Sequence, residues 1–162
     1  MFQLFFQSAI ALLFSAVSLI AVAEVREIEW MDLMPEEEAE AWLDDQSGVQ
    51  HSGAGPANTF QSETTVGELD GQQLRLPGFV VPVETTAEGK LKEFFLVPYF
   101  GACIHVPPPP ANQIIYGRLE EPVDMVNIWD AFWMEGTLNI EDVSNETADS
   151  AYTMEVDTLE LY

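Results

Sequence analysis

The chain has 162 residues, of which 28 are Asp or Glu and only 5 are Lys or Arg, so its formal net charge at pH 7 is −23. Such a negative surface repels phosphate backbones, and the composition therefore excludes a nucleic-acid-binding protein. Apolar residues make up 48% of the chain, which suffices for one modest core. The acidity favours solubility and basic partners, although adaptation to a saline habitat accounts for it equally well.

The N-terminal segment has the pattern of an export signal. Residues 1–23 carry no charged side chain and end in Ala21-Val22-Ala23, which fits the A-x-A rule for signal peptidase. We therefore predict cleavage after Ala23 and a periplasmic mature protein. A retained anchor is the alternative, because no Lys or Arg precedes the apolar stretch. That stretch is shorter than the roughly 20 residues that span a bilayer, and it contacts the membrane only if it is uncleaved.

Residues 24–63 are predicted to form an N-terminal extension of the folded domain. Pro35 and the three Glu residues after it favour the start of a short helix, since carboxylates in the first turn complement the helix dipole. From Asp44 to Ser62 the chain is rich in Gly, Ser, Gln and Asn without apolar periodicity, which is typical of a flexible linker. His51 lies in this linker, where a histidine is usually solvated.

Residues 64–162 are predicted to form a mainly β domain. Apolar patterning indicates five strands, over residues 74–83, 91–99, 113–119, 129–140 and 151–161. The first strand is long and bent, with a one-residue phase slip at Pro77-Gly78 that predicts a bulge. Between the third and fourth strands, residues 121–127 have room for only a helical turn. We therefore predict a small five-stranded OB-like barrel, with a sandwich fragment as the alternative.

The most distinctive segment is FGACIHVPPPPANQ, from Phe100 to Gln113. Consecutive prolines cannot join a β-ladder and favour a stiff polyproline II spur, which we expect to be exposed. Four prolines stabilise a core poorly, so we interpret the spur and its flanking aromatic residues as a surface that a partner protein recognises. The predicted partner-binding residues are Tyr99, Phe100, Pro107, Pro108, Pro109, Pro110, Asn112, Gln113 and Tyr116.

Within this segment Cys103 stands two residues before His105. On an extended segment both side chains project to the same side, where they are candidate ligands for Zn(II) or Cu(I). Two ligands do not complete a zinc site, so the others would come from a carboxylate, from His51 or from a partner chain. The structural alternative is that Cys103 is a small packing residue and that His105 orients the spur.

The sequence contains no catalytic constellation that we recognise. There is no G-x-S-x-G, no H-E-x-x-H and no phosphate-binding glycine loop, so we predict that the protein is not an enzyme. Thiol-redox chemistry is a further alternative. Cys103 is the one cysteine, so any disulfide that it forms would be intermolecular.

Three segments together resemble a known family. They are LRLPGFVVPV from Leu74, FLVPYFGACIHVPPPPANQIIYG from Phe95, and FWMEGTL from Phe132. These segments are similar to the signature blocks of domain-of-unknown-function family 3299, found in proteobacterial envelope proteins, although Ala111 stands where a fifth proline is expected. The resemblance implies an envelope location and a setting beside ABC-transporter components, sometimes with metal-responsive genes. It brings no known activity.

We therefore predict a periplasmic accessory or adaptor protein, associated with an ABC-type transporter and with metal homeostasis. The alternatives are a zinc- or copper-binding protein that acts alone, a thiol-redox protein that uses Cys103, and, more weakly, an OB-like reader of oligosaccharides.

Overall fold

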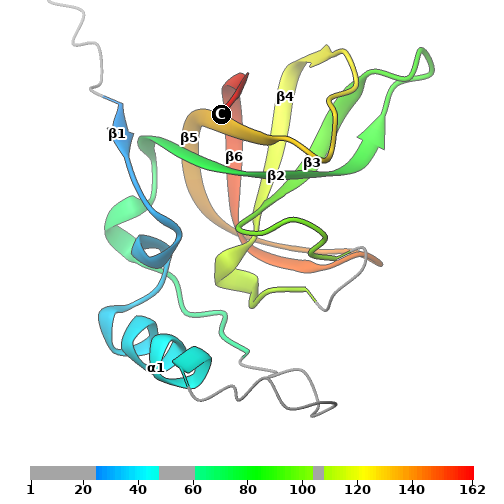
Figure 1. The fold of residues 1–162 in the computed structure, drawn as a ribbon. Coiled ribbons are helices and arrows are strands. Elements are labelled where there is room, and N and C mark those ends of the chain that lie inside the picture. Colours follow the sequence, from blue (N-terminus) through cyan, green and yellow to red (C-terminus); the bar gives the residue numbers. More distant parts are fainter. Residues whose placement is uncertain (1–24, 48–60, 104–107) are drawn as a thin grey trace, which may run out of the picture.

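The computed structural model describes residues 25–47, 61–103 and 108–162. The described elements form a strongly curved β-sheet with one helix at its lower side (Figure 1). In chain order they are β1 (Arg26–Glu27), η1 (Trp30–Leu33), α1 (Glu36–Ser47), η2 (Gly67–Leu69), β2 (Gln72–Thr85), β3 (Leu91–Val97), η3 (Ala111–Gln113), β4 (Ile115–Val123), β5 (Ala131–Ser144) and β6 (Asp149–Leu161). The predicted helical turn over 121–127 is absent, because β4 continues to Val123 and pairs there with Leu91.

Strand β2 closes the barrel because it pairs with both β5 and β3. Its first half, from Gln72 to Phe79, is antiparallel to β5, and its second half, from Phe79 to Thr85, is antiparallel to β3. The barrel continues from β3 through β4 and β6 to β5, and β4 and β6 are parallel. This arrangement confirms the predicted mainly β fold, a small five-stranded OB-like barrel with a short N-terminal helix.

The alternation of β2 differs from the predicted phase slip. Burial alternates without interruption from Leu74 to Val80, so Gly78 faces inward and Phe79 faces outward. A Cβ atom on Gly78 would lie 2.7 Å from Cγ of Leu96, which explains why a glycine occupies this inward position. The predicted bulge at Pro77-Gly78 is therefore wrong, and the register shifts of β2 lie further along, between residues 82 and 85.

Strand β3 is buried on both faces, because apolar clusters lie inside and outside the barrel. Phe94 and Leu96 point into the inner core, whereas Phe95 and Val97 belong to a second cluster. This outer cluster also contains Val81, Ala102, Ile114, Tyr116 and Ala148. The outer face of β3 and β4 is thus covered by the chain's own loop after β3 and by the β5–β6 hairpin.

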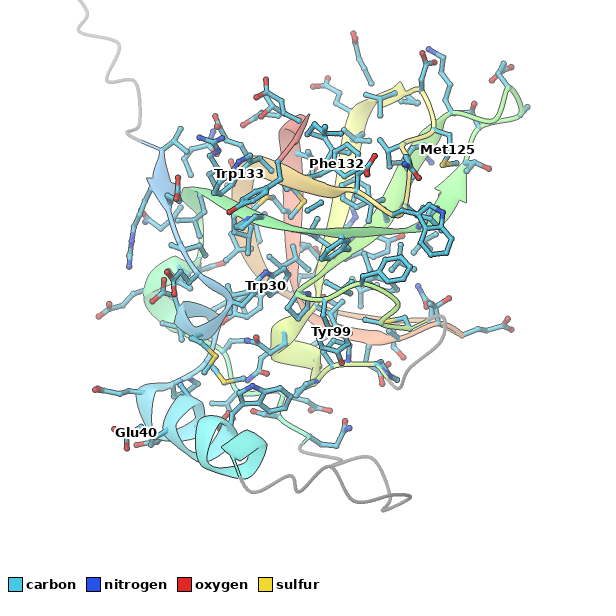
Figure 2. The ribbon with its side chains drawn as sticks, viewed as in Figure 1. Trp30, Glu40, Tyr99, Met125, Phe132 and Trp133 are labelled. Carbon is cyan, nitrogen blue, oxygen red and sulfur yellow. The ribbon has the colours of Figure 1, made fainter. Side chains whose placement is uncertain are left out.

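The segment before α1 packs with the barrel. Strand β1 lies parallel to β2, with Arg26 opposite Leu74, and Ile28 and Leu33 are buried in the inner core. The indole Nε1 of Trp30 donates a 2.7 Å hydrogen bond to the carbonyl of Pro77. Figure 2 shows Trp30 between the N-terminal segment and the barrel strands. These residues belong to the predicted N-terminal extension, and they contribute to the core of the barrel.

Helix α1 extends into the predicted linker. It ends at Ser47, so residues 44–47 are helical, and Ser62 at the other end of the linker is buried. Residues 48–60, with His51, lie outside the described residues, as do residues 1–24 with the predicted cleavage site. Among the helices in the described ranges, none is long and apolar enough to cross a membrane.

Candidate functional site

The second half of the proline-rich segment is buried. Pro108 is exposed, but Pro109 and Pro110 are buried, Asn112 is fully buried, and Gln113 is 3% exposed. The expected exposed spur is therefore wrong at Pro109 and Pro110, and Pro107 lies outside the described residues. The prolines lead directly into η3, which packs against β6 and presents two amide side chains to the interior.

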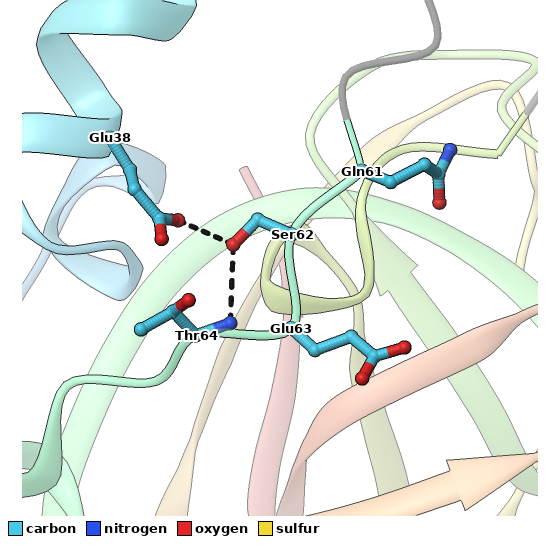
Figure 3. A pocket seen from close by; sticks show the side chains of 5 residues that line it. All are labelled: Glu38, Gln61, Ser62, Glu63 and Thr64. Atoms are coloured by element: carbon cyan, nitrogen blue, oxygen red, sulfur yellow. Dashed lines mark hydrogen bonds between the residues drawn. The ribbon is translucent and has the colours of Figure 1, made fainter.

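Asn112 joins three separate segments of the chain. Its Nδ2 donates hydrogen bonds of 2.9 Å to the hydroxyl of Ser62 and 2.9 Å to the carbonyl of Thr64. Ser62 in turn donates to the carboxylate of Glu38 on α1, as the close view in Figure 3 shows. Among the described atoms, the Oδ1 of Asn112 has no hydrogen-bond partner. The amide therefore fastens α1 and residues 62–64 to the barrel.

A hollow of about 420 Å³ lies beside this contact and is lined by Glu38, Gln61, Ser62, Glu63 and Thr64. Ser62 is not a free nucleophile there. Its oxygen donates to Glu38 and accepts from Asn112 at 2.9 Å and from the backbone N–H of Thr64 at 3.1 Å, so both lone pairs are used. We interpret the group as structural.

Gln113 and Tyr116 also have structural partners. Nε2 of Gln113 donates a 2.8 Å hydrogen bond to the carbonyl of Trp30, which holds η1 on the barrel. Tyr116 is 7% exposed, its hydroxyl donates to Glu93, and its ring meets that of Phe95 edge-on at 5.3 Å. Burial, followed by the hydrogen bond to Glu93, raises the pKa of Tyr116 to about 12. Both side chains are held inside the fold.

Cys103 lies in a turn and not on an extended segment. Its φ is +63°, in the left-handed region that non-glycine residues rarely adopt, so the expected same-side projection with His105 loses its basis. Burial raises the pKa of the half-buried Cys103 thiol to about 11, which keeps it protonated at neutral pH. His105 lies outside the described residues, and within the described ranges no group of three or more potential ligands is placed to hold a metal ion.

The exposed part of the segment carries aromatic rings. Phe100 is 40% exposed and stacks on Trp129, which is 63% exposed, with ring centroids 4.7 Å apart and planes at 27°. Phe79 on β2 meets Phe100 edge-on at 6.0 Å, and Tyr99, 39% exposed, precedes Phe100 in the chain. We call Phe79, Tyr99, Phe100 and Trp129 the aromatic rim.

Sequence reasoning found Tyr99 and Phe100 but missed Phe79 and Trp129. Trp129 was assigned to a strand, yet β5 begins at Ala131 and Trp129 lies in the preceding turn. The available signal was the presence of large apolar residues in an acidic loop, since Met125, in the same loop, is also 46% exposed. Figure 2 shows Met125 at the periphery of the barrel.

A second pair of aromatic residues lies on the outer face of β5. The ring of Trp133 meets that of the exposed Tyr162 at 5.1 Å. The guanidinium of Arg75 on β2 lies over Trp133, 4.1 Å from the ring centroid. Here, unlike at the aromatic rim, the chain covers its own indole with a cation.

Comparison with known proteins gives one consistent relationship. The family model described as "Protein of unknown function (DUF3299)" matches residues 30–161. The crystal structure of a DUF3299 family protein from Pseudomonas aeruginosa PAO1 is similar, with 38% sequence identity and a TM-score of 0.67, over 86% of this chain and 97% of that chain. No curated protein matches the chain.

Proposed function

This chain belongs to the DUF3299 family, and from the geometry of its aromatic rim we propose that it is an exported, non-enzymatic adaptor that captures a partner protein in the cell envelope. The observation that carries the proposal is the stacked pair of Phe100 and Trp129, whose rings stay 40% and 63% exposed. Large aromatic side chains are the residues most enriched at the centres of protein interfaces.

One rim residue lies on a strand, and the other three lie in loops close to strand ends. Phe79 belongs to β2 at the point where this strand changes its pairing from β5 to β3. Phe100 lies three residues after β3 ends at Val97, and Trp129 lies two residues before β5 begins at Ala131. Residues so close to strand ends have less conformational freedom to lose when a partner covers them than residues in a long loop.

The partner that we propose is the periplasmic part of an ABC-transporter component, a choice that rests on the envelope setting that the family resemblance implies. Metal homeostasis in the same setting remains a prediction. Zinc or copper binding by Cys103 and His105 is a separate hypothesis, and no observation on the described residues favours it.

Crosslinking pull-downs from envelope extracts test the adaptor role. We expect the double substitution Phe100→Ser and Trp129→Ser to lower partner capture at least tenfold, because rim residues of this type contribute more than about 1.4 kcal/mol. The matched control is Leu161→Ser with Tyr162→Ser, which removes two side chains that are 67% and 69% exposed elsewhere. Equal capture by the wild type and the rim variant would exclude the rim as the binding surface.

Export is tested separately by sequencing the N-terminus of the protein from the envelope fraction. We expect the first residue to be Glu24, since the small-residue site ends at Ala23. Recovery of Met1 in the membrane fraction would instead identify residues 1–23 as an anchor.

A further inference from the structure

The chain's own arginines indicate what its aromatic surfaces attract. Arg75 lies 4.1 Å from the ring centroid of Trp133, and Arg118 lies 5.2 Å from that of Tyr116. A cation within about 6 Å of a ring centroid is attracted by the negative face of the π-system, and tryptophan binds cations best. The ring of Trp133 on the outer face of β5 and the largely buried ring of Tyr116 are thus each covered by an intramolecular cation.

The stacked rings of Phe100 and Trp129 differ from these two rings in the described part of the chain. The chain has 5 basic residues, and all of them lie in the described ranges. Arg75 and Arg118 cover other rings, Lys90 pairs with Asp124 and Lys92 pairs with Glu84. Arg26 lines a hollow beside η1 and α1. Within the described part of the chain, no cation is recorded over Phe100 or Trp129.

The stretch of chain that leads into Trp129 is acidic. Residues 120–130, which include Trp129, contain four carboxylates and no basic residue: Glu120, Glu121, Asp124 and Asp130. The side chain of Asp124 is 97% exposed, and its one recorded ion pair, to Lys90, is 3.8 Å long. Asp130 accepts a 2.8 Å hydrogen bond from Asn127, which holds its carboxylate in the turn beside Trp129. These carboxylates add to the overall charge of −23.

The stacking geometry leaves a ring face available. Phe100 covers one side of Trp129 at 27°, and the indole remains 63% exposed. The exposed Trp129 therefore offers an uncovered π face in an acidic stretch of chain, directly before Asp130, and this combination of groups recognises an organic cation.

We infer that the partner presents an arginine or lysine side chain, and that this side chain stacks on Trp129 beside the carboxylates of residues 120–130. The inference rests on the proposed adaptor function and adds the chemistry of the partner's contact. Arg75 over Trp133 is the intramolecular equivalent of the contact. A purely apolar partner would use the same rings without this cation.

The experiment measures binding of an acetylated and amidated peptide, four repeats of Arg-Ala, to the processed chain purified from the envelope fraction. A chain with a charge of −23 binds any polycation at low salt, so only variants of equal charge are compared. Trp129→Leu keeps apolar area but removes the π face, Trp129→Phe restores an aromatic face, and Trp133→Leu is the matched control.

We expect Trp129→Leu to weaken peptide binding about threefold or more, Trp129→Phe to recover most of the loss, and Trp133→Leu to have no effect because Arg75 already covers that ring. Equal affinities of the wild type and Trp129→Leu would overturn the inference. If Trp129→Leu also captures the envelope partner normally while the Phe100→Ser, Trp129→Ser variant does not, the adaptor function stands and only the cation contact fails.

Discussion

The two ends of the proline-rich segment differ in the kind of side chain that they expose and bury. At its start, Tyr99 and Phe100 expose aromatic rings, whereas at its end Asn112 and Gln113 bury polar amides. Exposed rings and buried amides both reverse the usual preference of these residue types. The first arrangement leaves apolar rings in contact with solvent, whereas the second already has its partners inside the chain. A distinctive run of sequence therefore contains two separate features, of which only the first is a candidate for recognition.

The largest expected effect comes from the buried end. We expect Asn112→Ala to lower the free energy of unfolding by about 1–3 kcal/mol, because Thr64 loses a donor to its carbonyl and Ser62 loses a hydrogen bond. Urea denaturation measures the change. The matched control is Gln61→Ala, which truncates an exposed amide beside the same contact and should change stability by less than about 0.5 kcal/mol.

Partner capture by the Asn112→Ala variant tests whether the two ends of the segment have separate roles. If Asn112→Ala kept full stability yet lost partner capture, the buried end would belong to the recognition surface after all.

A smaller effect is expected at Cys103, between the two ends. Its φ of +63° favours glycine, so Cys103→Gly should be more stable than Cys103→Ala by about 1 kcal/mol. Both variants remove the thiol, so the difference isolates the backbone conformation. Thermal unfolding of the two proteins at one pH checks this expectation, and a more stable alanine variant would show that the turn is relaxed at this position.

Alkaline pH probes the boundary of the outer cluster. Burial raises the pKa of Cys103 from 9.0 to about 11 and that of Tyr116 from 10.0 to about 12, so the folded state favours the protonated forms. Their contribution to stability is complete below the ordinary values and is lost as pH rises through the folded values. We expect the urea midpoint to fall between pH 9 and pH 12, and Cys103→Ala to flatten the first part of this fall. An identical fall in the variant would assign the loss to other groups.

The smallest expected effect concerns metal. Cys103 lies in a turn with a φ of +63°, and within the described residues no group of three potential ligands is placed to hold a metal ion. We therefore expect Zn(II) titrations of the processed chain to give the same affinity for the wild type, for Cys103→Ser and for His105→Ala. If both variants bound Zn(II) at least tenfold more weakly than the wild type, the proline-rich segment would contain a metal site.

The strand pattern was predictable because it depends on local alternation. Leu74 and Leu76 on β2, and Tyr152, Met154 and Val156 on β6, are buried as their two-residue spacing indicates. Burial of Phe94 and Phe95 together was harder to interpret, since a strand with apolar clusters on both faces loses its alternation.

The candidate site was only half predictable for a different reason. The local sequence around Gln113 does not indicate that the acceptor for its amide is the carbonyl of Trp30, 83 residues away. The stack of Trp129 on Phe100 likewise joins two loops that only the closed barrel brings together. Local patterns therefore placed Tyr99 and Phe100 on the surface, but they did not predict the burial of Pro109, Pro110 and the two amides that follow them.

Closure of the barrel has a consequence for the order in which the chain folds. The hydroxyl of Tyr152 donates a hydrogen bond to the carbonyl of Leu33, which lies 119 residues earlier, and the first half of β2 pairs with the distant strand β5. Contacts of such long range form slowly and require almost the whole chain. The native barrel is therefore complete only after the last strand, β6, has been made and has joined β4 and β5.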